Sequence, residues 1–155
     1  MNLMLTLEGG LRIDAETPFD WEILQAIVYD AAGSDLAENL GALVTEETVS
    51  GDWNDFVVPD LKSEFEGQIA HVSKAVNEAK SSLESGTGSI WIKPSDAMIW
   101  YGALNQARLA LEEAHHLGDL DEPDLPEQET ARRSAFFRSQ FYLTIQSILL
   151  ERVMK

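Results

Sequence analysis

Five consecutive residues past the middle of the chain have the types and the spacing of a metal site. The run Glu112–His116, Glu-Glu-Ala-His-His, contains the Glu-x-x-His pattern twice. Residues three apart on a helix point the same way, and ferritin-like di-iron proteins place ligands with this spacing. Glu112, His115 and His116 are therefore candidate metal ligands, and His71 is the one other histidine that could join them.

A structural explanation of this cluster is favoured over a metal site. A di-iron site needs a second Glu-x-x-His motif on another helix, but Gln68 stands three residues before His71 and Lys74 three residues after it. His115 and His116 would instead lie in the last turn of a helix, where positive charge suits the helix dipole. The metal site remains the weaker alternative.

Motifs of nucleophilic and phosphate chemistry do not occur in the sequence. It contains no G-x-S-x-G, no Walker A loop and no H-E-x-x-H pattern. It also contains no cysteine, which excludes disulfides, thiolate metal sites and thiol-based redox sensing. We therefore expect a protein that is not an enzyme and that needs no cofactor.

Two further polar residues, Asn105 and Arg108, lie about one turn apart on a largely apolar stretch. A buried guanidinium needs a carboxylate or several carbonyls to offset its desolvation. We therefore predict that Arg108 joins its helix to an acidic neighbour or to a helix C-terminus. A binding site for an anion or a partner, formed by Arg108 and Asn105, is the alternative.

The helix that carries all of these residues is expected at 95–117, and the rest of the chain should pack around it. With a period of 3.6 residues, its apolar residues share one face: Ala97, Trp100, Ala103, Leu104, Ala107 and Leu111. The apolar surface continues most of the way round through Met98, Ile99, Leu109 and Ala110. Such a helix is normally buried by neighbours on several sides. Ser95 as N-cap and Gly118 as C′ glycine would bound it.

Short β-structure is expected at two places. Residues 3–14 alternate apolar and polar around Gly9–Gly10, with Leu3, Leu5 and Leu7 on one face, which predicts a hairpin. Residues 89–93 are a candidate third strand. In such a strand Ser89 and Trp91 would share one side, and Ile90 and Ile92 the other. A solvent-exposed Trp91 would indicate a docking surface.

Helices account for most of the remaining sequence. The first should begin after the cap Thr17 and end at Gly33, and a second should follow Ser34. A long amphipathic helix is expected from Asp60 to about Glu84, and a last one from near Glu127 to Val153. The main inward stripe of this last helix is predicted to contain Phe137, Phe141, Ile145 and Ile148, with Tyr142, Leu149 and Val153 alongside. Trp53 and Phe56 are predicted core anchors, and residues 118–128 an acidic loop.

The expected fold is therefore mainly α. It is one helical domain, 1–155, built as a bundle of about five helices around the central buried helix 95–117. A small N-terminal β-hairpin, with 89–93 as its candidate third strand, completes it.

The charge of the chain is its most unusual bulk property. There are 27 acidic residues against 11 basic ones, a net charge of −16. Such a field repels polyanions, so nucleic-acid binding is not expected. The acidity serves either solubility, the favoured reading, or attraction of a basic protein partner. The sequence contains neither a signal-peptide pattern nor a membrane-spanning run, so a cytoplasmic location is expected.

A family resemblance rests on residues 103–111, Ala-Leu-Asn-Gln-Ala-Arg-Leu-Ala-Leu. This stretch resembles the LN-x-x-RL-x-L signature of a mainly actinobacterial family of unknown function that includes the AosR-like oxidative-stress regulators. The resemblance implies a small helical cytoplasmic protein without established enzymatic activity. For the regulators in that family, it also implies a mechanism that uses a redox-active cysteine pair and contact with a sigma factor. Because this chain has no cysteine, only a protein-interaction role can carry over.

Two functional hypotheses follow from the sequence. The favoured one is a non-enzymatic protein-interaction or regulatory module that binds a protein partner. A partner with a basic surface is one candidate, and homodimerisation is a milder version of the same hypothesis. The alternative is a helical metalloprotein or metal-dependent enzyme that uses Glu112, His115 and His116.

Overall fold

The computed structural model describes residues 1–33, 58–81, 86–117 and 126–154. Within them lie a three-stranded antiparallel sheet and four α-helices, so the fold is mainly helical, as expected. This count covers the described residues alone and is lower than the expected five or so. The helix predicted after Ser34 and the anchors Trp53 and Phe56 lie outside the described residues. None of the described helices is both long and apolar enough to cross a membrane.

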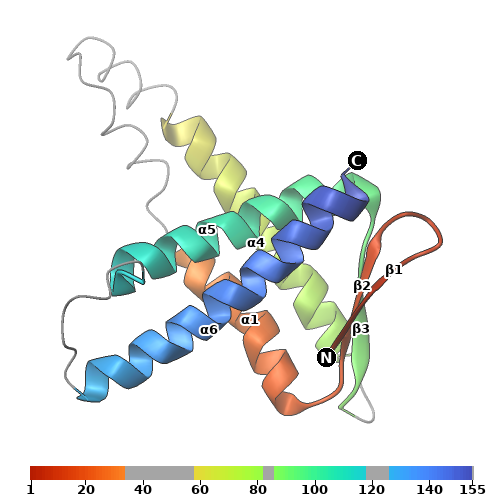
Figure 1. The fold of residues 1–155 in the computed structure, drawn as a ribbon. Coiled ribbons are helices and arrows are strands. Elements are labelled where there is room, and N and C mark those ends of the chain that lie inside the picture. Colours follow the sequence, from red (N-terminus) through yellow and green to blue (C-terminus); the bar gives the residue numbers. More distant parts are fainter. Residues whose placement is uncertain (34–57, 82–85, 118–125, 155) are drawn as a thin grey trace.

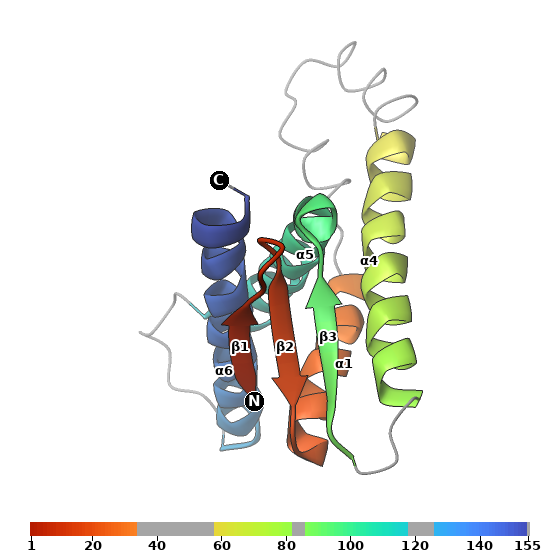
Figure 2. The same cartoon turned by 90° about the vertical axis from the view of Figure 1, so that its right-hand side faces the viewer.

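The sheet combines the two N-terminal strands with a strand from the middle of the chain. Strand β1 (Asn2–Leu5) pairs with β2 (Leu11–Ala15), and β2 pairs with β3 (Gly88–Ile92), all antiparallel. The predicted hairpin and third strand are thus confirmed. Figure 2 shows the sheet face-on, with β1 at one edge, α1 and α5 behind the sheet, and α4 beside β3 at the other edge.

The two glycines of the hairpin serve different purposes. Gly9 has a φ of +88°, the left-handed conformation that glycine adopts without strain. Gly10 has no positive φ, but a side chain there would collide with the carbonyl oxygen of Ile92. Leu7 lies in the turn and is fully exposed, so its predicted place on the face of Leu3 and Leu5 is wrong.

Helix α1 (Pro18–Ala32) begins and ends as predicted. The Thr17 side chain caps it by accepting a hydrogen bond from the backbone N–H of Asp20. In return, the Asp20 carboxylate accepts a hydrogen bond from the backbone N–H of Thr17. Such a reciprocal box satisfies two otherwise unpaired donors. The helix ends at Gly33. Trp21, buried on its inner face, donates from Nε1 to the carbonyl of Gly86 just before β3.

Helix α5 (Ala97–His115) lies at the centre of the helical layer. It packs against α1, α4 (Val58–Ser81) and α6 (Pro126–Ile148), as Figure 1 shows. Its predicted inward face is confirmed, since all six residues of that face are buried: Ala97, Trp100, Ala103, Leu104, Ala107 and Leu111. However, Met98 is 63% exposed and Leu109 is also exposed, so one side of the helix faces solvent.

Both ends of α5 differ from the prediction. A 3₁₀ turn, Pro94–Asp96, precedes it, and neither this turn nor α5 has a side-chain cap, so Ser95 is not the N-cap. At the other end His116 adopts the left-handed conformation predicted for Gly118. Residues 118–125 of the expected acidic loop lie outside the described residues, and 126–128 belong to α6.

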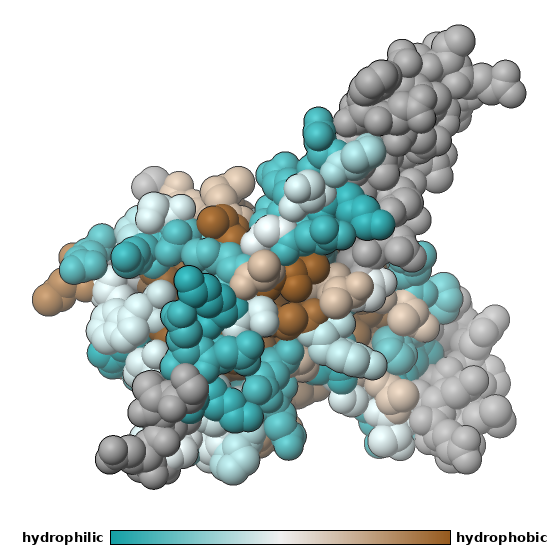
Figure 3. Space-filling model, turned by 180° about the vertical axis from the view of Figure 1, so that it is seen from behind, coloured by the Kyte–Doolittle hydropathy of each residue, from teal (hydrophilic) through white to brown (hydrophobic). Residues whose placement is uncertain are grey.

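The inner face of α6 is rotated relative to the predicted stripe. Phe137 is exposed and Phe141 and Ile148 are half-buried, whereas Tyr142, Ile145 and Leu149 are buried. Polar contacts to α1, described below, bring Tyr142 inward and explain the rotation. The helix continues as a π-helical turn, Leu149–Val153. From behind, hydrophilic side chains cover much of the described surface, with hydrophobic ones between them (Figure 3).

Candidate functional site

The sheet has one face against the helices and one face open to solvent. The residues that face the helices are buried: Leu11, Ile13, Ala15, Ile90 and Ile92. The register places Met4, Arg12 and Trp91 side by side across the three strands on the other face. Trp91 is 60% exposed and Met4 is 50% exposed. The predicted exposure of one side of β3 is thus confirmed, and the exposed side carries Trp91.

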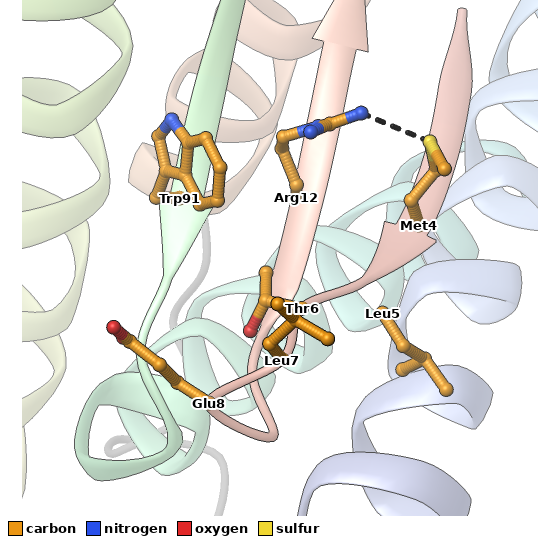
Figure 4. Close-up of a pocket in the computed structure, with 7 residues that line it drawn as sticks. All are labelled: Met4, Leu5, Thr6, Leu7, Glu8, Arg12 and Trp91. Carbon is orange, nitrogen blue, oxygen red and sulfur yellow. Dashed lines mark hydrogen bonds between the residues drawn. The ribbon is translucent and has the colours of Figure 1, made fainter.

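Arg12 lies between its two neighbours and contacts both (Figure 4). Its guanidinium lies 5.3 Å from the centroid of the Trp91 ring, within the range of a cation–π interaction. Its terminal nitrogen donates to the sulfur of Met4 at 3.0 Å. The same guanidinium forms an ion pair with Asp14, at 3.0 Å from Nε and 3.1 Å from the terminal nitrogen. These contacts hold the arginine across the sheet, where it keeps both apolar neighbours in place.

A second, polar row lies beside the first and consists of Asn2, Asp14 and Ser89. The Ser89 hydroxyl donates to Asp14 at 2.6 Å, and the side-chain amide of Asn2 donates to Glu16 at 2.9 Å. The Ser89 hydroxyl, assisted by the Arg12 guanidinium, holds the pKa of the Asp14 carboxyl below its usual value. Asp14 therefore stays charged and neutralises Arg12.

The open face contains two shallow hollows that share Arg12. The first has an apolar lining and an acidic residue at its rim: Met4, Leu5, Thr6, Leu7, Glu8, Arg12 and Trp91. The second is lined by more residues with polar side chains: Arg12, Asp14, Ala15, Glu16, Thr87, Gly88 and Ser89. Because Asp14 already neutralises Arg12, the carboxylates of Glu8 and Glu16 leave this face with an acidic border around an apolar centre.

Comparison with known protein families identifies a family for this chain. Residues 12–153 match the family described as a domain of unknown function, DUF2017. The chain belongs to the DUF2017 family. No curated protein and no solved structure matches it. The family description names no activity, so the function has to be argued from the side chains of this DUF2017 chain.

Arg108, predicted to pair with an acid or a helix end, has a neutral partner instead. It donates to the side-chain oxygen of Gln146 on α6 at 2.8 Å, and Gln146 donates in turn to the carbonyl of Tyr101 at 3.4 Å. The Nε of Arg108 is buried and has no hydrogen-bond partner within the described ranges. Asn105 is half-buried one turn away. Arg108 thus links α5 to α6 through the side-chain amide of Gln146.

The Glu/His cluster lies at the end of α5 as predicted. His116 is the C-cap residue of the helix, and two hydrogen bonds of its backbone hold it there. Its N–H bonds to the carbonyl of Glu112 at 2.8 Å, and its own carbonyl accepts from Arg132 at 2.6 Å. His71 lies 3.8 Å from Asp96, at the opposite end of α5. With a rise of 1.5 Å per residue, Asp96 and His115 are about 28 Å apart along the helix. In the described part of the chain, no three potential ligands come together.

Two clusters of this DUF2017 chain were not found from the sequence. One is the row Met4–Arg12–Trp91, of which only Trp91 was predicted. The other joins α1 to α6: Arg138 donates to both carboxylate oxygens of Asp30, at 2.9 and 3.3 Å, and Tyr142 donates to the same carboxylate. The signal for the first was the alternation of Arg12 and Asp14 in a strand. The second has no local signal, since its members lie on helices far apart in sequence.

Proposed function

We propose that this protein is a non-enzymatic protein-interaction module, and that the open face of its sheet is the surface that binds the partner. The observation that carries the proposal is the 60% exposure of Trp91 in a row with Arg12 and the half-exposed Met4. Tryptophan and arginine are the residues most enriched at binding hot spots. Large exposed apolar side chains gathered on a sheet face are typical of interaction sites.

Charge supports a basic partner. The chain has a net charge of −16, and Glu8 and Glu16 border the open face. Complementary charge increases the rate of association and selects against acidic partners. A partner that presents apolar side chains among lysines or arginines would fit the apolar centre and its acidic border. Binding should weaken as salt screens these charges.

A regulatory role is the finer form of this proposal. The resemblance of residues 103–111 to the signature of a family that includes the AosR-like oxidative-stress regulators supports regulation through contact with a protein. The redox step of those regulators has no counterpart in this chain, which contains no cysteine. We propose that the partner contact alone carries the regulation and that it takes place in the cytoplasm.

The test is affinity capture from the native cell with three baits: the wild-type chain, Trp91→Ala and Tyr29→Ala. Tyr29 is also a highly exposed aromatic residue, but it lies on α1, away from the sheet face. A specific partner should be enriched by the wild type and by Tyr29→Ala, fall about tenfold with Trp91→Ala, and be lost in high salt. Equal capture by all three baits would count against the open face as the binding surface.

A further inference from the structure

Strand β1 is an open edge of the sheet. The strand order is β1-β2-β3, and helix α4 contacts β3 at the opposite edge. Figure 2 shows β1 as the outermost strand, with no strand beyond it. An edge strand presents unpaired backbone groups, which can form hydrogen bonds with another extended chain.

The backbone of Leu3 and Leu5 points toward this edge. The N–H of Thr6 bonds to the carbonyl of Gly10 at 2.9 Å, so this pair is hydrogen-bonded within the hairpin. Hydrogen-bonded and non-hydrogen-bonded pairs alternate in an antiparallel ladder. Met4 and Asn2 therefore bond to β2, while the N–H and C=O groups of Leu3 and Leu5 face outward. No other described residue satisfies these outward groups.

Apart from its short length of four residues, β1 lacks the features that normally protect an edge strand. Natural sheets guard their edges with lysines, prolines, bulges or a covering element. Strand β1 reads Asn-Leu-Met-Leu, without a charge or a proline, and pairs with β2 without a bulge. Its Met4 and Leu5 side chains are 50% and 53% exposed. Because this unprotected edge lies beside the proposed binding face, we expect the edge to take part in binding.

Charge indicates which chain occupies the edge. Glu16 lies at one end of β1, where it accepts the bond from Asn2, and Glu8 lies in the turn that follows the other end. A carboxylate thus marks each end of the free edge. A second copy of this chain would bring another net charge of −16 and would be repelled. A basic segment would be attracted.

We infer that a basic, extended segment of the partner adds to β1 as a fourth strand, with its backbone paired to Leu3 and Leu5 and its lysines or arginines near Glu8 and Glu16. This inference rests on the proposed function and specifies its binding mode. Main-chain hydrogen bonds supply affinity in such strand addition, and alternate side chains supply specificity. Every second side chain of the added strand would lie on the open face, and one of them would extend the row Met4–Arg12–Trp91 beside Met4.

The first experiment uses a probe peptide and needs no variant. The peptide is KVTVTK with blocked ends, and its control is EVTVTE, in which glutamates replace the terminal lysines. Amide hydrogen exchange of the full chain is followed by NMR. We expect KVTVTK to slow exchange at Leu3 and Leu5 about tenfold, and EVTVTE to leave it unchanged. Unchanged exchange at both amides with saturating KVTVTK would overturn the inference.

The second experiment compares Leu5→Pro with Leu5→Val. Proline removes the outward N–H of Leu5 but leaves the bonds to β2, because residues 2, 4 and 6 make them. Valine changes the side chain and keeps the N–H. We expect Leu5→Pro to weaken the binding of KVTVTK about tenfold and Leu5→Val to change it little. Thermal unfolding checks that both variants fold. If Leu5→Pro does not fold, the hydrogen-exchange experiment on the wild-type chain tests the inference by itself.

The two proposals can fail separately. If capture of the native partner depends on Trp91 but is the same with Leu5→Pro, the open face is the binding surface and the added strand is refuted. If neither substitution matters, both proposals fall. Sedimentation of the free chain provides the third outcome: a dimer that protects the Leu3 and Leu5 amides would assign the edge to a second copy and overturn the basic segment.

Discussion

The hydroxyl of Tyr142 donates a hydrogen bond of 2.7 Å to the carboxylate of Asp30, and this buried contact joins α6 to α1. Burial, together with this bond to a carboxylate, raises the pKa of Tyr142 far above its usual value, so the phenol stays neutral. Arg138 neutralises the same carboxylate from the adjacent turn of α6. A charge pair and a phenol thus fix the contact between the two helices.

Removal of Asp30 should therefore destabilise the chain more than removal of the Tyr142 hydroxyl. Asp30→Ala leaves Arg138 and Tyr142 without their acceptor, and we expect a loss of about 2–3 kcal/mol in the free energy of unfolding. The loss stays below that of a fully buried pair because the Arg138 side chain is 22% exposed. Tyr142→Phe should cost about 1–2 kcal/mol. Urea denaturation measures both, and the reverse order would contradict this assignment.

The pair Arg108–Gln146 should be non-additive. Gln146→Leu alone leaves the partly buried guanidinium without its acceptor and should cost about 1–3 kcal/mol. Adding Arg108→Met removes the group that was left unpaired, so the double variant should recover about 1 kcal/mol. A double-mutant cycle in urea measures the coupling. Additive losses would mean that the 2.8 Å contact contributes nothing to stability.

Two helical glycines should respond oppositely to alanine. Gly102 of α5 lies against the side-chain amide of Gln68 of α4, which a Cβ would overlap. Gly102→Ala would push this amide away from Gln106, which donates to it at 2.9 Å, and losing that bond should outweigh the gain in helix propensity and destabilise the chain by about 1 kcal/mol. Gly67, in the exposed part of α4, has no atom within 4 Å of an added Cβ, so Gly67→Ala should stabilise it by up to about 1 kcal/mol. Thermal unfolding of the two variants, compared under one set of conditions, gives the sign of each effect.

Alanine substitutions of Trp91 on the open face and Trp100 in the core should have different effects on binding and on stability. Trp100 is buried among the other core residues, so Trp100→Ala should cost about 3–5 kcal/mol. Trp91 is largely exposed, and Trp91→Ala should cost about 1 kcal/mol or less, mainly the cation–π contact with Arg12. Binding of the partner should be lost with Trp91→Ala while the fold is retained. A large fall in stability with Trp91→Ala would assign it a structural role.

Acid should unfold the chain in a way that depends on Asp14 and Asp20. The Ser89 hydroxyl lowers the pKa of Asp14, and two backbone N–H groups, from Glu16 and Thr17, lower the pKa of Asp20 although burial opposes them. A carboxyl whose folded pKa lies below its unfolded value stabilises the fold above the unfolded pKa, and this contribution disappears as pH falls through the folded pKa. The unfolding free energy should therefore decline below about pH 4.

Ser89→Ala is the matched variant for this pH dependence. It should cost about 1 kcal/mol at neutral pH, and the difference from wild type should shrink as Asp14 becomes protonated. Urea denaturation at a series of pH values below 7 measures the two curves. A difference that is constant over that range would show that the loss does not come from the charge of Asp14.

Local patterns in the sequence predicted the elements and the faces that they bury. The caps of α1, the hairpin, the third strand and the inward face of α5 all depend on neighbouring residues with a fixed period. These patterns do not identify which residue of another element a side chain contacts. Arg108 needed a partner on chemical grounds, but nothing within a few turns of it identified Gln146.

The missed features depend on contacts between distant segments. The row Met4–Arg12–Trp91 exists only in the register of three strands, and β2 and β3 are separated by a segment that includes α1 and α4. The periodicity of a helix also does not show how many other helices pack around it. Met98 and Leu109 were therefore expected inside, but they face solvent. Likewise, the rotation of α6 follows from the bond between Tyr142 and Asp30, and the apolar stripe alone favoured Phe137.

The pairing of β2 with β3 has a consequence for folding. The proposed binding face needs both the first strands of the chain and a strand that follows α4, so it is absent from any state in which these segments have not yet met. Such long-range pairing forms late in folding because its loop-closure entropy must be overcome first. A partner that recognises the face therefore binds only the folded chain, and by mass action its binding raises the melting temperature.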